Sequence, residues 1–205
     1  IIMLKHLKYA SILGLSALAV ACGSSGSGTA KTPDNTKVDL SNSPKGLVDI
    51  KTADGALIGY NQDYSFYGVW VNDEKTKQEI RHQGIKTPTT KLLKGSVTYT
   101  GHAVRARDSI IAQNVDGVQT DGKTTLNVNF DTKKVSGKIE MPLARDITLH
   151  ETNLDGSSFD GKASVLLNDS GKYTGALYGL KAEEAAGTVT FENNPALNTS
   201  FGGKR

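Results

Sequence analysis

The sequence contains a single cysteine, Cys22, among its 205 residues. One thiol excludes an intramolecular disulfide, and it excludes zinc or iron–sulfur sites built from several cysteines. Apolar residues are also few, at 37% of the chain, but with 22% charged residues this content is still typical of a globular protein. The length suits one domain, or one domain with a small companion.

Neither sign of charge dominates the chain. It carries 24 Lys and Arg residues against 21 Asp and Glu residues, a formal net charge of +3. If an N-terminal segment containing Lys5 and Lys8 is removed, 22 basic residues face 21 acidic residues and the net charge falls to +1. Nucleic-acid binding requires clustered positive charge, so we expect no nucleic-acid partner.

Only one long apolar run occurs, and it lies near the N-terminus. It covers residues 9–21 and follows the basic residues Lys5 and Lys8. The run has the length of the apolar region of a signal peptide and is too short to cross a bilayer core of about 30 Å. Residues 1–21 are therefore predicted to be a signal peptide.

Cys22 follows this run directly, and residues 23–28 read GSSGSG. The arrangement resembles a bacterial lipobox, with Ala19 where leucine is commoner; an ordinary secretory signal with a chance cysteine is the alternative. The resemblance implies that Cys22 is the acylated N-terminus, held by palmitate-type chains worth about 0.8 kcal/mol for each buried CH₂ group. Gly23 in second place, instead of Asp, implies the outer membrane of a Gram-negative bacterium. The polar residues 22–42 are predicted to be a flexible, disordered tether.

The chain after residue 95 alternates between apolar and polar residues, as in half-buried β-strands. One example is Leu126, Val128 and Phe130, which alternate with threonine and asparagine. Eight strands are expected, at about 95–106, 124–131, 134–141, 147–152, 158–168, 171–179, 186–193 and 199–204. Their short, regular connections favour an antiparallel up-and-down barrel or a sandwich over a parallel sheet, and glycines recurring on inward positions favour a small barrel.

Three other segments are less regular. Residues 43–94 are predicted to be a small irregular β subdomain or an insertion that completes the barrel, with a strand at 64–71 and a polar loop at 74–94, with or without one short strand. Residues 116–123 are expected to form a turn. Residues 181–186, rich in alanine and glutamate, favour a single helical turn or an ordinary loop.

The sequence shows almost no sign of a catalytic, metal-binding or cofactor-binding site. The sequence lacks the nucleophile, zinc-protease, phosphate-binding and dinucleotide-binding motifs, so we expect no enzyme, no catalytic residue and no cofactor. Beyond the signal peptide the histidines are His82, His102 and His150. No two of them have metal-ligand spacing on one element, so no metal site is expected. Each remains a candidate axial haem ligand in an alternative hypothesis.

Residues 171–191 read GKYTGALYGLKAEEAAGTVTF. This segment resembles the signature of the surface-lipoprotein β-barrels, namely the barrels of transferrin-binding protein B and the C-terminal barrel of factor H binding protein. Residues 95–101 and 124–139 resemble the opening strands of these barrels, and residues 201–205 resemble their closing strand. The resemblance covers residues 95–205 and implies an eight-stranded antiparallel up-and-down barrel that is filled by side chains.

The resemblance also implies a function. Members are displayed on the outer surface of Gram-negative bacteria, are exported by a surface-lipoprotein machinery and bind host molecules such as transferrin, factor H, haemoglobin or haem, without catalysis. Binding surfaces differ among members, so no binding residue is carried over to this chain. The leading hypothesis is therefore a surface lipoprotein that binds a host protein for nutrient capture or immune evasion. The alternatives are a haem- or haemoglobin-binding lipoprotein and a structural outer-membrane lipoprotein without a ligand.

Overall fold

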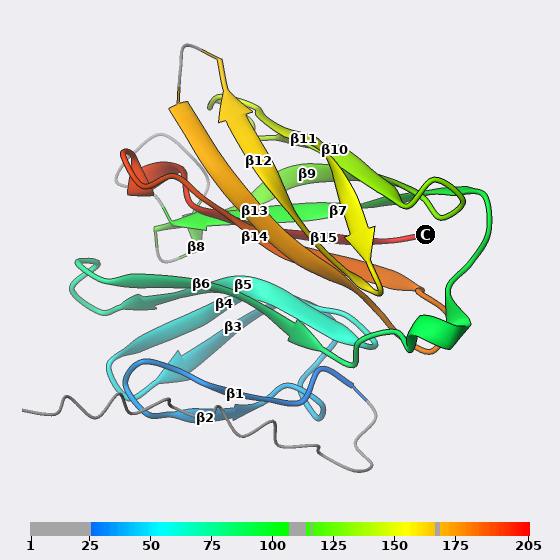
Figure 1. Cartoon of the computed structure of the whole chain (residues 1–205). Helices are drawn as coiled ribbons and strands as arrows, with labels where there is room; N and C mark the ends of the chain where they lie inside the picture. Colours follow the sequence, from blue (N-terminus) through cyan, green and yellow to red (C-terminus); the bar gives the residue numbers. More distant parts are fainter. Residues whose placement is uncertain (1–25, 107–113, 116, 167–168) are drawn as a thin grey trace, which may run out of the picture.

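The computed structural model describes residues 26–106, 114–115, 117–166 and 169–205. The predicted signal peptide and Cys22 lie outside these residues. Three layers lie one above another in Figure 1: a hairpin at the bottom, a four-stranded sheet in the middle and a barrel at the top. The hairpin and the middle sheet precede the barrel in the chain.

The barrel consists of eight antiparallel strands and is closed. Strand β10 pairs with both β9 and β11, and β15 pairs with both β14 and β7, so the hydrogen-bonded ring has no free edge. The two-residue strand β8 (Asn114–Val115) pairs only with β9. The ring contains β7 (Ser96–Ala106), β9 (Val118–Asn129), β10 (Lys134–Glu140), β11 (Ile147–Asp155), β12 (Ser158–Val165), β13 (Asp169–Tyr178), β14 (Glu184–Thr190) and β15 (Thr199–Lys204). The predicted eight-stranded barrel is confirmed.

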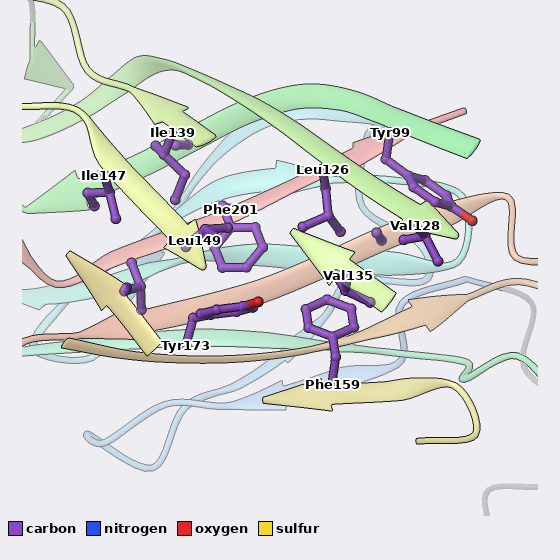
Figure 2. Close-up of a cluster of buried hydrophobic side chains, with 14 of the residues drawn as sticks. Tyr99, Leu126, Val128, Val135, Ile139, Ile147, Leu149, Phe159, Tyr173 and Phe201 are labelled. Atoms are coloured by element: carbon purple, nitrogen blue, oxygen red, sulfur yellow. The ribbon is translucent and has the colours of Figure 1, made fainter. Parts of the chain in front are cut away.

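Apolar side chains fill the barrel. Figure 2 shows rings and branched side chains from opposite walls meeting in the interior, among them Tyr99, Leu126, Tyr173 and Phe201. These four side chains are almost completely buried. The hydroxyl of Tyr99 donates a 2.8 Å hydrogen bond to the carbonyl of Ala182, so its polar group does not remain unpaired in the core. The interior is therefore a packed core and not a ligand channel.

The middle sheet contains β3 (Gly46–Thr52), β4 (Gly55–Asn61), β5 (Ser65–Asn72) and β6 (Gln78–Gly84), paired in that order. Both of its faces are covered. Tyr67 and Val69 face the barrel, whereas Phe66 and Trp70 pack against the hairpin. Because every residue of β5 is buried, its sequence is almost continuously apolar instead of alternating. None of these described strands pairs with a barrel strand.

The predicted tether is wrong for residues 26–42. These residues form the hairpin of β1 (Thr29–Lys31) and β2 (Lys37–Asp39), and Ala30, Val38 and Leu40 are buried against the middle sheet. The carboxylate of Asp34 accepts hydrogen bonds from the N–H groups of Thr36 and Asp54, which joins the hairpin to the β3–β4 turn. The segment is polar, and this composition suggested disorder. Its few apolar residues become buried only because they pack on the middle sheet, which comes later in the chain.

Two further expectations need correction. Residues 118–123 belong to β9 and not to a turn, because β7 extends to Ala106 and pairs with Val118. Of the two alternatives for residues 181–186, the helical turn is wrong and the ordinary loop holds for residues 181–183. Gly179 and Ala182 have φ values of 92° and 55°, which produce a tight turn, and β14 begins directly afterwards at Glu184. The segment expected to be a polar loop contains β6 and the short 3-10 helix η1 (Thr89–Lys91).

Candidate binding surfaces

A buried carboxylate joins the middle sheet to the barrel. Glu184 at the start of β14 is only 1% exposed. It accepts hydrogen bonds from the N–H groups of Asp63 and Tyr64, at 2.9 and 3.1 Å, and from the hydroxyl of Ser65, at 2.8 Å. Burial raises the pKa of Glu184, and these hydrogen bonds together with Lys204 oppose that rise. The sheet is thus held on the barrel by a satisfied buried acid.

Two of the candidate histidines lie at the same junction, but apart from each other. Nδ1 of His82 on β6 is 2.7 Å from the hydroxyl of Tyr178 on the barrel. Burial, with a smaller contribution from Lys86, lowers the pKa of His82 to about 4. The ring of His102 on β7 stacks on Tyr60 of the sheet, with centroids 4.2 Å apart and planes 4° from parallel. The His82 ring therefore packs between the sheet and the barrel, whereas the His102 ring stacks on Tyr60 at an exposed position.

His150, the third candidate, is exposed on β11, where its Nε2 lies 2.7 Å from the hydroxyl of Ser164. The structure does not bring the three histidines together. Among the described residues, no group of three His, Cys, Asp or Glu side chains is placed to hold a metal ion. No described helix is long and apolar enough to cross a membrane.

One end of the barrel presents two exposed leucines on neighbouring loops. Because successive strands run in opposite directions, the β10–β11, β12–β13 and β14–β15 connections lie at the same end. Leu143 on the first of these loops is 78% exposed and Leu166 after β12 is 79% exposed. The Nη1 of Arg145 donates a 3.5 Å hydrogen bond to the carbonyl of Leu166, which links the two loops. The parts of these two loops that carry Leu143, Arg145 and Leu166 are called the leucine loops below.

Leu143 is held in a strained conformation. The N–H of Ala144 donates a 3.0 Å hydrogen bond to the carbonyl of Met141, which closes a turn with Pro142 in second place and Leu143 in third. Leu143 has a φ of 56°, a value that favours Gly or Asn in such turns and costs a branched residue free energy. Leu143 thus keeps an exposed side chain at a strained backbone position.

A polar cavity of about 350 Å³ opens at the same end, between the β5–β6 turn and the 3-10 helix η2 (Pro195–Leu197). Its lining includes Lys75, Thr76, Lys77, Asn193, Asn194 and Pro195. The Nε2 of Gln78 donates a 3.3 Å hydrogen bond to the carbonyl of Pro195, so the sheet and the barrel meet at its wall. In Figure 1 the β5–β6 turn and η2 both lie at the left. The leucine loops and this cavity form the candidate binding end.

Sequence reasoning proposed histidines and missed these leucines. A signal was present, because Leu143 interrupts a loop of proline, arginine and aspartate, and Leu166 lies where an apolar strand gives way to a turn. Alternation alone does not separate such residues from core residues. The aromatic segment 64–71 is mostly core, since Phe66, Tyr67 and Trp70 are all buried.

The barrel is closed and its interior is filled, the middle sheet packs on it, and three loops lie together at one end. Residues 93–205, more than half of the chain, match the family of the C-lobe and N-lobe β-barrels of transferrin-binding protein B. The chain therefore belongs to this family. A comparison with curated protein sequences gives no match.

Solved structures share the fold. The structure of HpuA from Kingella denitrificans in complex with human haemoglobin is similar with a TM-score of 0.67 at 21% identity, over 86% of this chain and 75% of HpuA. Transferrin-binding protein B from Haemophilus parasuis gives 0.62 at 18% identity, over 88% of this chain and 41% of that protein. The N-lobe of lactoferrin-binding protein B from Moraxella bovis gives 0.51 at 15% identity, over 88% and 96% of the two chains. This chain thus spans less than half of that transferrin binder.

Proposed function

We propose that the protein is a lipid-anchored surface protein of a Gram-negative outer membrane that binds a host protein through the leucine loops and the adjoining cavity. The observation that carries this proposal is the joint display of Leu143 and Leu166 at one end of a rigid barrel. Fully burying a leucine contributes about 1.5–3 kcal/mol, so covering both leucines with a partner would stabilise a complex. The family supports a binding role without catalysis.

Haemoglobin is the first host protein to test. The chain covers 75% of HpuA, which was solved in complex with human haemoglobin, but 41% of a transferrin-binding protein. The TM-score to HpuA, 0.67, also exceeds the 0.62 to that transferrin-binding protein, which supports testing haemoglobin first. Transferrin and factor H are the other partners to compare.

The anchor is part of the same proposal. Cys22 is acylated after removal of residues 1–21, and a surface-lipoprotein machinery exports the protein. Mass spectrometry of the protein purified from a Gram-negative host should find acyl chains on Cys22, and C22A should lack them. A free thiol at Cys22 in the mature protein would contradict the anchor without affecting the binding end.

The binding test uses the full lipoprotein in detergent with immobilised haemoglobin, transferrin and factor H. Haemoglobin should be retained, and the L143S/L166S double variant should bind about ten-fold more weakly or worse, because two apolar anchors are lost. L47S, which removes an exposed leucine from β3, is the matched control and should bind normally. Failure to retain any of the three proteins would favour the structural lipoprotein without a ligand.

A haem-ligand role for His82, His102 or His150 stays a prediction. Titrating the full protein with haemin tests it directly. A Soret shift that disappears in H102A or H150A, the variants of the two exposed histidines, would support it.

A further inference from the structure

The chain enters the folded part of the protein at a fixed point. The hydroxyl of Ser27 donates hydrogen bonds of 2.6 Å to Oδ1 of Asn61 and 2.9 Å to the carbonyl of Ser65, both at the β4–β5 turn. Its own carbonyl accepts a 2.9 Å hydrogen bond from Nε2 of Gln83. Cys22 is five residues earlier, so an extended chain places it at most about 18 Å from Ser27. An acyl anchor on Cys22 would therefore lie close to this end of the molecule.

The same turn also touches the end of the barrel opposite to the leucine loops. The Nζ of Lys204 lies 2.8 Å from Oδ2 of Asp63, and Glu184 accepts its hydrogen bonds there. The first described residues, the β13–β14 turn and the C-terminal end of β15 all lie toward the right in Figure 1. The point where an anchor would attach and this barrel end therefore face the same way.

This end carries apolar and basic side chains together. Leu180 in the β13–β14 turn is 61% exposed, and Ile85 beside it is also exposed. The N–H of Gly179 donates a 2.8 Å hydrogen bond to the carbonyl of Ile85, which fixes the two segments side by side. Lys86 and Lys181 are the exposed chain neighbours of Ile85 and Leu180. We call Ile85, Lys86, Leu180, Lys181 and Arg205 the basal face.

The positive charge of the basal face is mostly not neutralised within the described residues. The guanidinium of Arg205 donates to the carbonyls of Ala182 and Lys181, at 3.0 and 3.1 Å, which are neutral acceptors. The Nζ of Lys86 donates to the hydroxyl of Ser158 at 3.1 Å. Glu183 accepts the N–H of Lys181, and Asp155 pairs in register with Ser158, so two acids also lie at this end. Lys204 does not contribute because it is paired with Asp63 and Glu184.

We propose that the basal face rests on a lipid bilayer, with Leu180 and Ile85 at the headgroup boundary and Lys86, Lys181 and Arg205 facing lipid phosphate groups. The inference rests on the proposed acylation of Cys22. Apolar residues mixed with Lys and Arg are the pattern by which surfaces bind anionic bilayers. The contact orients the protein and does not anchor it, since the acyl chains supply the attachment. The leucine loops then point away from the membrane, toward a host protein.

The test uses the full lipoprotein reconstituted in vesicles of phosphatidylcholine and phosphatidylglycerol. A fluorophore is attached to a new thiol in L180C or in L166C, a comparably exposed leucine at the opposite end. Lipids with a nitroxide in the headgroup quench fluorophores that lie near them. Emission should be lost in L180C and retained in L166C. The loss should shrink in K86Q/K181Q, and also when salt rises from about 0.1 M to about 1 M, which shortens the screening length from about 10 Å to about 3 Å.

K75Q/K77Q, at the candidate binding end, is the charge-matched control and should leave the quenching of L180C unchanged. Equal quenching at the two positions, with acyl chains found on Cys22, would overturn the basal face and leave the proposed anchor intact. Absence of acyl chains on Cys22 would overturn both. Haemoglobin retention by the same samples reports on the host-protein proposal independently of either result.

Discussion

The hydroxyl of Ser65 in the middle sheet donates a 2.8 Å hydrogen bond to the carboxylate of Glu184 on the barrel, and both side chains are buried. This contact makes the docking of the sheet on the barrel specific, because apolar contacts alone would allow the two layers to slide. Its loss should weaken the whole junction.

E184Q should destabilise the protein by about 2–3 kcal/mol, because the new amide group would face N–H and O–H donors that then lack an acceptor in a buried site. Urea unfolding of E184Q and of the unmodified protein measures the difference in the free energy of unfolding. E183Q is the matched control, since Glu183 accepts only the N–H of Lys181 at a partly exposed position. Equal stability of the two variants would contradict the role given to Glu184.

Lowering the pH should destabilise the junction between the middle sheet and the barrel, because His82 there would become protonated. The folded protein holds the pKa of His82 at about 4, below the value of about 6.5 in an unfolded chain, so folding favours the neutral ring. The stabilisation from this group is complete above about pH 6.5 and is lost as the pH falls toward 4, by about 1–3 kcal/mol. Unfolding free energies measured between about pH 7 and about pH 4.5 report the loss.

H82Q should flatten this pH dependence, whereas H150Q, at an exposed position, should keep it. An unchanged slope in H82Q would show that other groups cause the acid sensitivity.

Gly202 on β15 lies under the ring of Tyr67 from the middle sheet. A Cβ atom added at Gly202 would be 2.4 Å from the Tyr67 ring and 2.8 Å from the carbonyl oxygen of Ala185. G202A should therefore cost about 1–3 kcal/mol by overpacking the junction. Thermal unfolding of G202A, Y67A and the double variant forms a mutant cycle. The G202A cost should shrink when Tyr67 is absent, and additive costs would refute the contact.

Because Leu143 has a left-handed backbone conformation, replacing it with asparagine should change stability and binding in opposite directions. L143N should leave the protein as stable or raise its stability by about 1 kcal/mol, because asparagine tolerates this conformation. The same change should weaken haemoglobin binding. L166N, at a residue without a positive φ, should weaken binding with no gain in stability. A loss of stability in L143N would show that its side chain packs in the fold.

Much of the barrel could be predicted from the sequence because alternation is a local signal. Leu126 and Val128 face inward where their strand requires it, and the closing strand begins and ends where it was expected. The hairpin was missed because three apolar residues, Ala30, Val38 and Leu40, are too few to indicate a core. They are buried because they pack against Phe66 and Trp70 of the middle sheet. Burial there is decided by tertiary packing and not by local composition.

The candidate binding end was harder to predict for a different reason. Histidines were the candidates because of their chemistry, but His82 packs between two layers and His102 stacks on Tyr60. Leu143 and Leu166 stand out only when their exposure is known, since a leucine in a sequence is usually read as core. The exposed fraction is a property of the assembled fold.

Closure of the barrel by its first and last strands has a consequence for how the protein folds. The Nε of Arg105 on β7 donates a 2.8 Å hydrogen bond to Oγ1 of Thr199 on β15, and the two residues are 94 positions apart. Contacts between such distant residues form slowly, because loop-closure entropy opposes them until late. During synthesis one edge of β7 has unpaired backbone N–H and C=O groups until β15 is made, and such unpaired edges promote aggregation. Deleting β15 should therefore leave a soluble yield far below that of the full chain.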